Sequence, residues 1–269
     1  MTGQTGWIPE TVDIGQPSTA RMYDYILGGG HNLEADRLLV DKMLAAQPEM
    51  RRFAIMNRAF LRRVVLFLIE SGIRQFLDLG SGIPTVGNVH EIAQQADPEC
   101  RVVYVDYEPV AVAHSELVLE GNDRAVILQA DITEPDIVLH APQTRRTLDF
   151  REPIGILAIT IGHHLSPQRD PVGVFARYRD AVTPGSYLAI THTTDDYATA
   201  RTLAVRELAR KGHIGVYPRN RAEVMALFGD FELVEPGLVT TSQWRPERPE
   251  DVAVNPEDDG FYAAVARKP

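Results

Sequence analysis

The chain has 269 residues, a length that suits one large α/β domain with an appended segment. Its 44% hydrophobic and 24% charged residues exclude wholesale disorder. The 27 basic and 37 acidic residues give a net charge of −10, which argues against a general nucleic-acid binder because phosphate binding needs positive charge.

The cellular compartment is indicated by three simple features. A single cysteine, Cys100, excludes an internal disulfide and suits a reducing compartment. The N-terminal residues lack the basic head and apolar core of a signal peptide. No apolar run approaches the ~18 residues that a membrane helix needs. We therefore expect a cytoplasmic protein with no membrane partner, while the oligomeric state is left open.

The first third of the chain is expected to be mainly helical. An amphipathic pattern covers residues 37–43, and apolar side chains at helical spacing predict a helix over residues 51–71. Three consecutive glycines at residues 28–30 disfavour a helix, so the polar stretch around them, residues 21–36, is expected to form a loop.

From residue 74 onward, short apolar strands alternate with helices. The strands are expected at residues 75–80, 101–106, 125–131, 154–160 and 186–192, with helices at 88–96, 110–120, 135–140 and 171–182. Such alternation predicts parallel pairing, because parallel strands need a crossover connection. Two further helices, at 198–211 and 221–228, precede strands at 231–240 and 260–267, which should close the sheet as an antiparallel hairpin.

The segment QFLDLGSGIPT, residues 75–85, joins a buried strand to a helix through a glycine-rich turn. Gly80 and Gly82 allow positive φ and a close approach of the backbone to a ligand. This arrangement is typical of nucleotide-like cofactor sites, although a tight turn alone would also explain it.

The acid in this segment narrows the type of cofactor. Asp78 would face a pyrophosphate with like charge, and Thr85 stands where a dinucleotide motif has its third glycine. A carboxylate at this position suits a ligand that carries an ammonium group instead. Two more acids, Asp106 and Asp131, end the next two strands, where they could accept from ribose hydroxyls and from an adenine amino group, or merely cap helices.

With these motifs the sequence resembles the class I S-adenosylmethionine-dependent methyltransferases. It is most similar to a bacterial methyltransferase-like family long catalogued as a domain of unknown function, through ARMYDYILGGGHNLEADR, NRAFLRRVVLFL, QFLDLGSGIPT, NVHE, VVYVDYEP and PGSYLAITH. The resemblance implies a Rossmann-like α/β fold with a seven-stranded, mostly parallel sheet of order 3-2-1-4-5-7-6 and a helical N-terminal extension. It also implies a cofactor site for S-adenosylmethionine, with S-adenosylhomocysteine as product.

The resemblance assigns the cofactor's parts to particular residues. Asp78, Gly80 and Gly82 would hold the methionine moiety, Asp106 the ribose, and Asp131 with Ile132 the adenine. Tyr107 would pack on the adenine or ribose, and the remaining members of this site are Ser81, Pro84 and Ile161.

Residues 1–71 are expected to form a lid and acceptor-pocket extension on a cofactor domain of residues 72–269. The candidates for orienting the acceptor in catalysis are Tyr23 and Asp24. Arg21, His31, Asn32, Asn57 and Arg58 are assigned to the lid and substrate pocket, with helix packing and surface solvation as the other explanation.

His163 follows the fourth strand and is a candidate general base, because imidazole titrates near neutral pH; it could also be a hydrogen-bonded wall residue. It neighbours His164, and on an extended backbone the two side chains would point to opposite faces. With one cysteine and no HxH or HExxH spacing, no metal site is expected.

The sequence therefore predicts a methyltransferase that acts on a small-molecule acceptor, with no nucleic-acid partner. Two alternatives remain: a non-catalytic S-adenosylmethionine sensor, and a Rossmann-type NAD(P) oxidoreductase, which Asp78 and Thr85 disfavour. The acceptor itself cannot be named from the residues.

Overall fold

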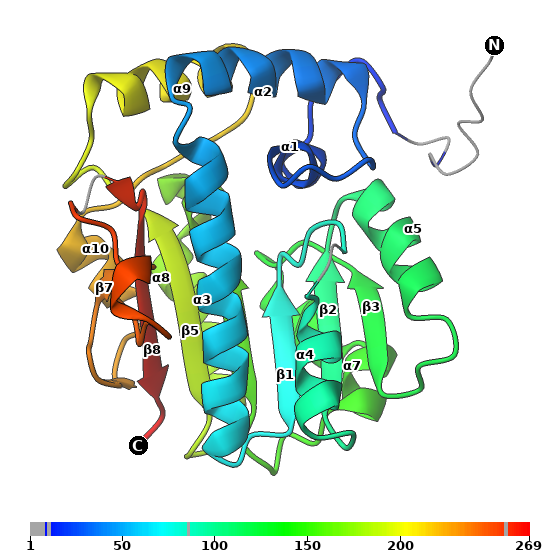
Figure 1. The fold of residues 1–269 in the computed structure, drawn as a ribbon. Helices are drawn as coiled ribbons and strands as arrows, with labels where there is room; N and C mark the ends of the chain where they lie inside the picture. The colour runs from blue at the N-terminus through cyan, green and yellow to red at the C-terminus, as the bar shows by residue number, and fades with distance from the viewer. Residues whose placement is uncertain (1–8, 10–11, 85–86, 256–257) are drawn as a thin grey trace.

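The computed structural model describes residues 9, 12–84, 87–255 and 258–269. A mostly parallel sheet lies between helical layers, and further helices cross the edge where the parallel strands end (Figure 1). The α/β Rossmann-like class expected from the sequence is confirmed. Among the described residues, none of the helices is long and apolar enough to cross a membrane.

The sheet has the order β3-β2-β1-β4-β5-β8-β6, with β7 also paired to β8. Its parallel strands are β1 (Gln75–Leu79), β2 (Arg101–Asp106), β3 (Ala125–Gln129), β4 (Gly155–Ile159) and β5 (Tyr187–Thr193). The strand β8 (Phe261–Arg267) runs antiparallel beside β5, as expected for a closing strand. Since the carboxyl ends of β1 to β5 meet at one edge, that edge is where a ligand is expected.

The strand expected at residues 231–240 is divided. The described part of the sheet therefore has eight strands, because β6 (Glu232–Leu233) and β7 (Val239–Thr240) pair separately with β8. Between them Pro236 lacks a backbone donor, and the N–H of Gly237 bonds to the carbonyl of Val234 at 2.8 Å to close a turn. The turn interrupts the ladder without changing the fold class.

Both faces of the sheet are covered, which explains why its strands are apolar on both sides. One face packs on α3 (Met50–Glu70), α4 (Val89–Ala96) and α5 (Pro109–Val118), together with the buried Trp244. The other face packs on α6 (Pro135–His140), α7 (Pro142–Thr147), α8 (Pro171–Ala181) and α10 (Arg221–Ala226).

The remaining helices lie over the carboxyl edge. They are α1 (Thr19–Ile26), α2 (Glu34–Ala46) and α9 (Ala200–Lys211), and Figure 1 shows α2 and α9 side by side across the top of the sheet. The expected loop over residues 21–36 is wrong at both ends, because α1 extends to Ile26, with Met22 buried, and α2 already begins at Glu34. The glycines disfavour a helix only where they stand.

Candidate active site

A cavity of about 130 Å³, here called the cofactor cavity, lies at the carboxyl ends of β1, β2 and β4. It brings together most of the residues assigned to the cofactor from the sequence: Asp78, Gly80, Ser81, Gly82, Asp106, Tyr107 and Ile161. The N-terminal helices contribute Thr19, Tyr23, Asn57 and Arg58 to the same lining.

The glycine turn has the conformation that its sequence requires. Gly80 and Gly82 have φ of +71° and +67°, in the left-handed region. A Cβ on Gly80 would lie 2.4 Å from Cγ1 of Ile161, so that position also needs glycine for packing. The N–H groups of Gly80 and Ser81 both donate to the carbonyl of Val105, at 2.8 and 3.1 Å, which ties the turn to β2. Thr85, used to disfavour a dinucleotide site, lies outside the described residues.

Asp78 is a buried carboxyl group at the back of this turn. Burial raises its pKa to about 7; Arg58 opposes the rise and Asp106 adds to it. Near neutral pH it is therefore poised between its charged and neutral forms. An ammonium group placed against it would favour the charged form and form a charge-assisted hydrogen bond.

Asp106 is held in place by backbone donors. Its Oδ1 accepts from the N–H of Glu108 at 2.9 Å, and its Oδ2 accepts from the N–H of Gly82 at 2.7 Å. Burial raises the pKa of Asp106 to about 6, and these two N–H groups limit the rise. Each carboxylate oxygen keeps a second acceptor position, so the pair can still accept two ligand hydroxyls.

The residues expected at the adenine do not line the cofactor cavity. Oδ1 of Asp131 accepts from the N–H of Thr133 at 2.8 Å, and its Oδ2 lies 3.3 Å from Nη2 of Arg169. Ile132 is part of the buried core. Arg169 instead lines a wider opening of about 490 Å³, which shares Thr19, Tyr107, Ile161 and His164 with the cofactor cavity.

Pro84 also lies outside the cofactor cavity. It lines a small neighbouring recess together with Asp78, Ser81 and Gly82, on the side of α4.

Arg21 fastens α1 to two other helices. Its Nε lies 2.7 Å from Oδ2 of Asp36 in α2, and its Nη1 lies 2.7 Å from Oε1 of Glu108 before α5. Only 2% of Arg21 is exposed, and all three groups are buried. The predicted lid residue is thus the centre of a buried ion-pair network, and it lines only the wider outer opening.

Asp24, His31 and Asn32 shape the loop after α1 and line neither of the cavities at the carboxyl edge. Oδ2 of Asp24 accepts from the N–H of His31 at 2.8 Å and from Nδ2 of Asn32 at 2.9 Å. The ring of His31 packs on that of His114, with centroids 3.8 Å apart. Among the described residues Asp24 holds this loop, and the catalytic role expected for it from the sequence stays a prediction.

Tyr23, Asn57 and Arg58 do meet at the cofactor cavity. Nδ2 of Asn57 donates to the hydroxyl of Tyr23 at 3.0 Å, and Nη2 of Arg58 donates to the carbonyl of Gly87 at 2.6 Å. Burial raises the pKa of the Tyr23 phenol, although Asn57 and Arg58 act against that rise. Tyr23 therefore keeps its proton at neutral pH.

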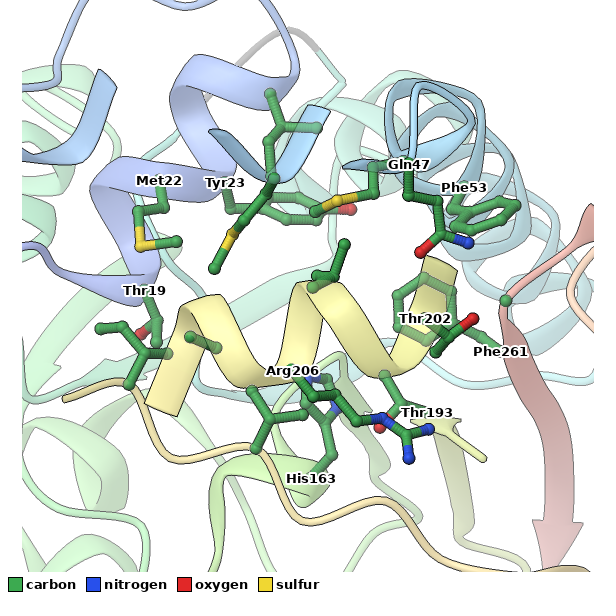
Figure 2. A pocket seen from close by; sticks show the side chains of 18 of the residues that line it. Thr19, Met22, Tyr23, Gln47, Phe53, His163, Thr193, Thr202, Arg206 and Phe261 are labelled. Carbon is green, nitrogen blue, oxygen red and sulfur yellow. The ribbon is translucent and has the colours of Figure 1, made fainter. Parts of the chain in front are cut away.

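A second cavity, about 200 Å³ in volume and here called the roof cavity, lies between α1, α2, α3 and α9 (Figure 2). It shares Thr19, Tyr23, His163, His164 and Phe261 with the cofactor cavity. The two cavities therefore adjoin at these shared residues.

His163 and His164 lie on a short 3₁₀ turn, η1 (Gly162–His164), and not on an extended backbone. Their rings are 4.3 Å apart and both line the two cavities, so the expectation of opposite faces is wrong. Burial lowers the pKa of His163 well below its ordinary value, with added effects of His164, His192 and Arg219. Its ring is neutral at pH 7, and its buried Nδ1 has no hydrogen-bond partner among residues 9, 12–84, 87–255 and 258–269. Among the described residues, no His, Cys, Asp and Glu side chains group as metal ligands.

The parallel sheet with an antiparallel β8, and the cavity beside the glycine turn, define the Rossmann-like class of methyltransferases. The model of the S-adenosyl methyltransferase family matches residues 5–269, and the chain belongs to this family.

Two solved structures are similar over nearly the whole chain. One, from Thermobifida fusca and described as a candidate methyltransferase, is 40% identical, covers 97% of this chain and 98% of its own, and gives a TM-score of 0.91. The other, a DUF574 family protein from Streptomyces avermitilis, is 38% identical. It covers 96% of this chain and 99% of its own, and gives a TM-score of 0.92. No curated protein matches the chain.

Proposed function

We propose that this protein transfers a methyl group from S-adenosylmethionine to a small acceptor held in the roof cavity. The observation that carries the proposal is that the cofactor cavity and the roof cavity adjoin. Both are lined by Tyr23, His163 and Phe261, here called the shared wall. Membership of the S-adenosyl methyltransferase family supports the reaction type and does not identify the acceptor.

The lining of the cofactor cavity fits S-adenosylmethionine in its chemistry. Asp78 can accept from the ammonium group, and Asp106 from the ribose hydroxyls. The buried hydroxyl of Ser81 makes no hydrogen bond with the described part of the chain, so it is available to a ligand. When bound, S-adenosylmethionine supplies an electrophilic sulfonium methyl group, and S-adenosylhomocysteine is the product after its transfer.

The chain's own residues then orient the acceptor and take its proton. The neutral ring of His163 can accept a hydrogen bond from an O–H or N–H group, and can receive that proton as the new bond to the methyl carbon forms. Tyr23 stays protonated and is held by Asn57, so it can position a polar group at the shared wall.

Calorimetric titration separates this proposal from its alternatives. We expect S-adenosylmethionine and S-adenosylhomocysteine to bind and NAD not to bind. Asp106→Ala should weaken S-adenosylhomocysteine by about 2 kcal/mol, roughly thirtyfold, because it removes charge-assisted hydrogen bonds. Asp136→Ala, which removes an exposed carboxylate of α6, serves as the matched control.

Two results would contradict the proposal. Unchanged affinity in a folded Asp106→Ala variant would mean that the ribose is not held at β2. Tight binding of S-adenosylhomocysteine without its formation from S-adenosylmethionine, across a broad library of hydroxyl- and amine-bearing acceptors, would favour a sensor.

A further inference from the structure

The roof cavity has a mainly apolar lining, which comes from both halves of the chain. Methionines and aromatic or aliphatic side chains face it, among them Met22, Met43, Met50, Phe53, Val205 and Phe261. Figure 2 shows Met22 and Phe53 reaching the cavity from the blue N-terminal helices, and Phe261 from the red strand β8. Methionine side chains adapt to varied shapes and make favourable contacts with aromatic rings. The volume of about 200 Å³ exceeds the roughly 150 Å³ of an engineered apolar cavity that binds benzene.

Charge is almost absent from this lining. Of the described residues around the cavity, Arg206 is the one with a full charge, and it is already paired with Asp195. Its Nη2 also donates to the carbonyl of Thr194 at 3.0 Å. A charged acceptor would lose its hydration here without gaining a counter-ion, which is costly.

Two polar atoms in the lining lack partners. The Nδ1 atom of His163 and the Oγ1 atom of Thr193 are buried and make no hydrogen bond with any residue that the structure describes. Figure 2 shows both residues on the same side of the cavity. Buried polar groups without partners are rare and costly, so a ligand donor at this position would satisfy a group that is otherwise unpaired.

We infer that the acceptor is an uncharged molecule with an apolar, ring-containing body and one O–H or N–H donor, which binds in the roof cavity with the donor on His163. This inference rests on the proposed function and specifies its substrate class. The apolar body packs among the methionines and phenylalanines, while the donor group is also the nucleophile. Its place beside the shared wall brings it toward the cofactor cavity.

Three naphthalene probes test the inference in the presence of saturating S-adenosylhomocysteine. The probes are 2-naphthol, 2-methoxynaphthalene and naphthalene-2-carboxylate, and calorimetry measures their affinities. We expect 2-naphthol to bind, and to bind at least about thirtyfold more tightly than the carboxylate. In His163→Phe, the ratio of naphthol to ether affinity should fall about threefold to tenfold, the typical value of one hydrogen bond. Any steric difference between the two probes cancels in this comparison.

A pair of variants on α9 locates the binding site. Val205→Trp fills the roof cavity and should weaken 2-naphthol at least tenfold, while S-adenosylhomocysteine binding is kept. Leu203 lies on the same helix and is 56% exposed. Leu203→Trp should therefore change neither the affinity for 2-naphthol nor that for S-adenosylhomocysteine.

The possible failures are distinguishable. If S-adenosylhomocysteine does not bind, the proposed function fails and the inference with it. If it binds, the inference alone is overturned by equal or tighter binding of the carboxylate, by no binding of any probe, or by naphthol binding that Val205→Trp leaves unchanged.

Discussion

At the scale of single residues, the charge of Asp78 should control cofactor affinity through pH. Its pKa of about 7 means that the carboxyl is neutral below this pH and charged above it. Only the charged form pairs with an ammonium group, so S-adenosylhomocysteine affinity should be constant above pH 7 and fall toward tenfold per unit below it. Calorimetry between pH 5.5 and 8.5 measures this profile.

The control for the Asp78 profile is Asp78→Asn, which cannot titrate. In that variant affinity should be low at all pH values and begin to fall only near pH 6, where Asp106 is protonated. A wild-type profile without a decline between pH 7 and 6 would show that Asp78 does not bind the ammonium group.

Local and distant residues of the site differ in how far the sequence predicts them. Asp78, Gly80 and Gly82 were predicted because strand, turn and helix follow one another along the chain. For Asp131 the adenine contact stays a prediction, because an acid at a strand end can also satisfy the next turn, as its bond to Thr133 shows. Phe261 gave no signal, since its place at the cavities depends on β8 inserting between β5 and β6.

At the scale of elements, the segment after α9 holds the turn that carries His163. The N–H of Tyr217 donates to the carbonyl of His163 at 2.7 Å, and Nδ1 of His164 lies 2.7 Å from the carbonyl of Gly215. Arg219 donates to the carbonyls of Gly162 and Leu165, at 2.9 and 2.8 Å. The orientation of η1 thus depends on a segment about fifty positions later in the chain.

Arg219 also acts on the histidines electrostatically. Its Nη1 donates to Nε2 of His192 at 2.7 Å, and its charge contributes to the lowered pKa of His163. Arg219→Ala should therefore raise the pKa of His163, as measured by NMR titration of its ring. It should also reduce the free energy of unfolding by about 2–3 kcal/mol, because buried carbonyls lose their donor.

Arg221→Ala is the matched control for this prediction. It removes a similar bond, from Nη1 to the carbonyl of Leu238 at 2.7 Å, without touching η1. If both variants shifted the His163 titration equally, Arg219 would have no particular role in positioning the turn.

Elements that follow a clear hydrophobic period were predicted well, and those fixed by tertiary contacts were not. The five parallel strands and α3 have buried apolar residues at regular spacing. In contrast, α1 buries two charged residues, Arg21 and Asp24. The partners of Arg21 are Asp36 and Glu108, which lie 15 and 87 positions later in the chain. A polar helix of this kind resembles a loop until its partners are known.

At the scale of the whole molecule, the N-terminal helices are joined to the sheet domain by several buried contacts. Met22, Val40 and Met43 form one cluster with Ala209 of α9, and Ala20 packs with Ile83 and residues of α5. The apolar side of α3 belongs to the main core. We therefore propose that residues 12–71 fold as part of the cofactor domain and complete its cavities.

The Arg21 network gives a stability test of this union. Arg21→Ala leaves the buried carboxylates of Asp36 and Glu108 without their cation, which should cost about 3–5 kcal/mol in urea unfolding. Arg37→Ala, at an exposed position of α2 that bonds to Asn32, should cost less than about 1 kcal/mol. Equal losses would mean that the network does not join the helices.

The position of α1 over the cofactor cavity predicts how the molecule responds to its ligand. Thr19, Ala20 and Tyr23 line that cavity, so a bound cofactor would contact α1 directly. S-adenosylhomocysteine should therefore slow amide hydrogen exchange in α1 at least about tenfold, because opening this helix away from the sheet would require losing the ligand contacts. The helix α8 packs on one face of the sheet, away from the cofactor cavity, and provides the internal control. Its amides should exchange at an unchanged rate. Equal exchange in α1 with and without the ligand, at concentrations where calorimetry shows saturation, would mean that this helix covers the cavity without taking part in binding.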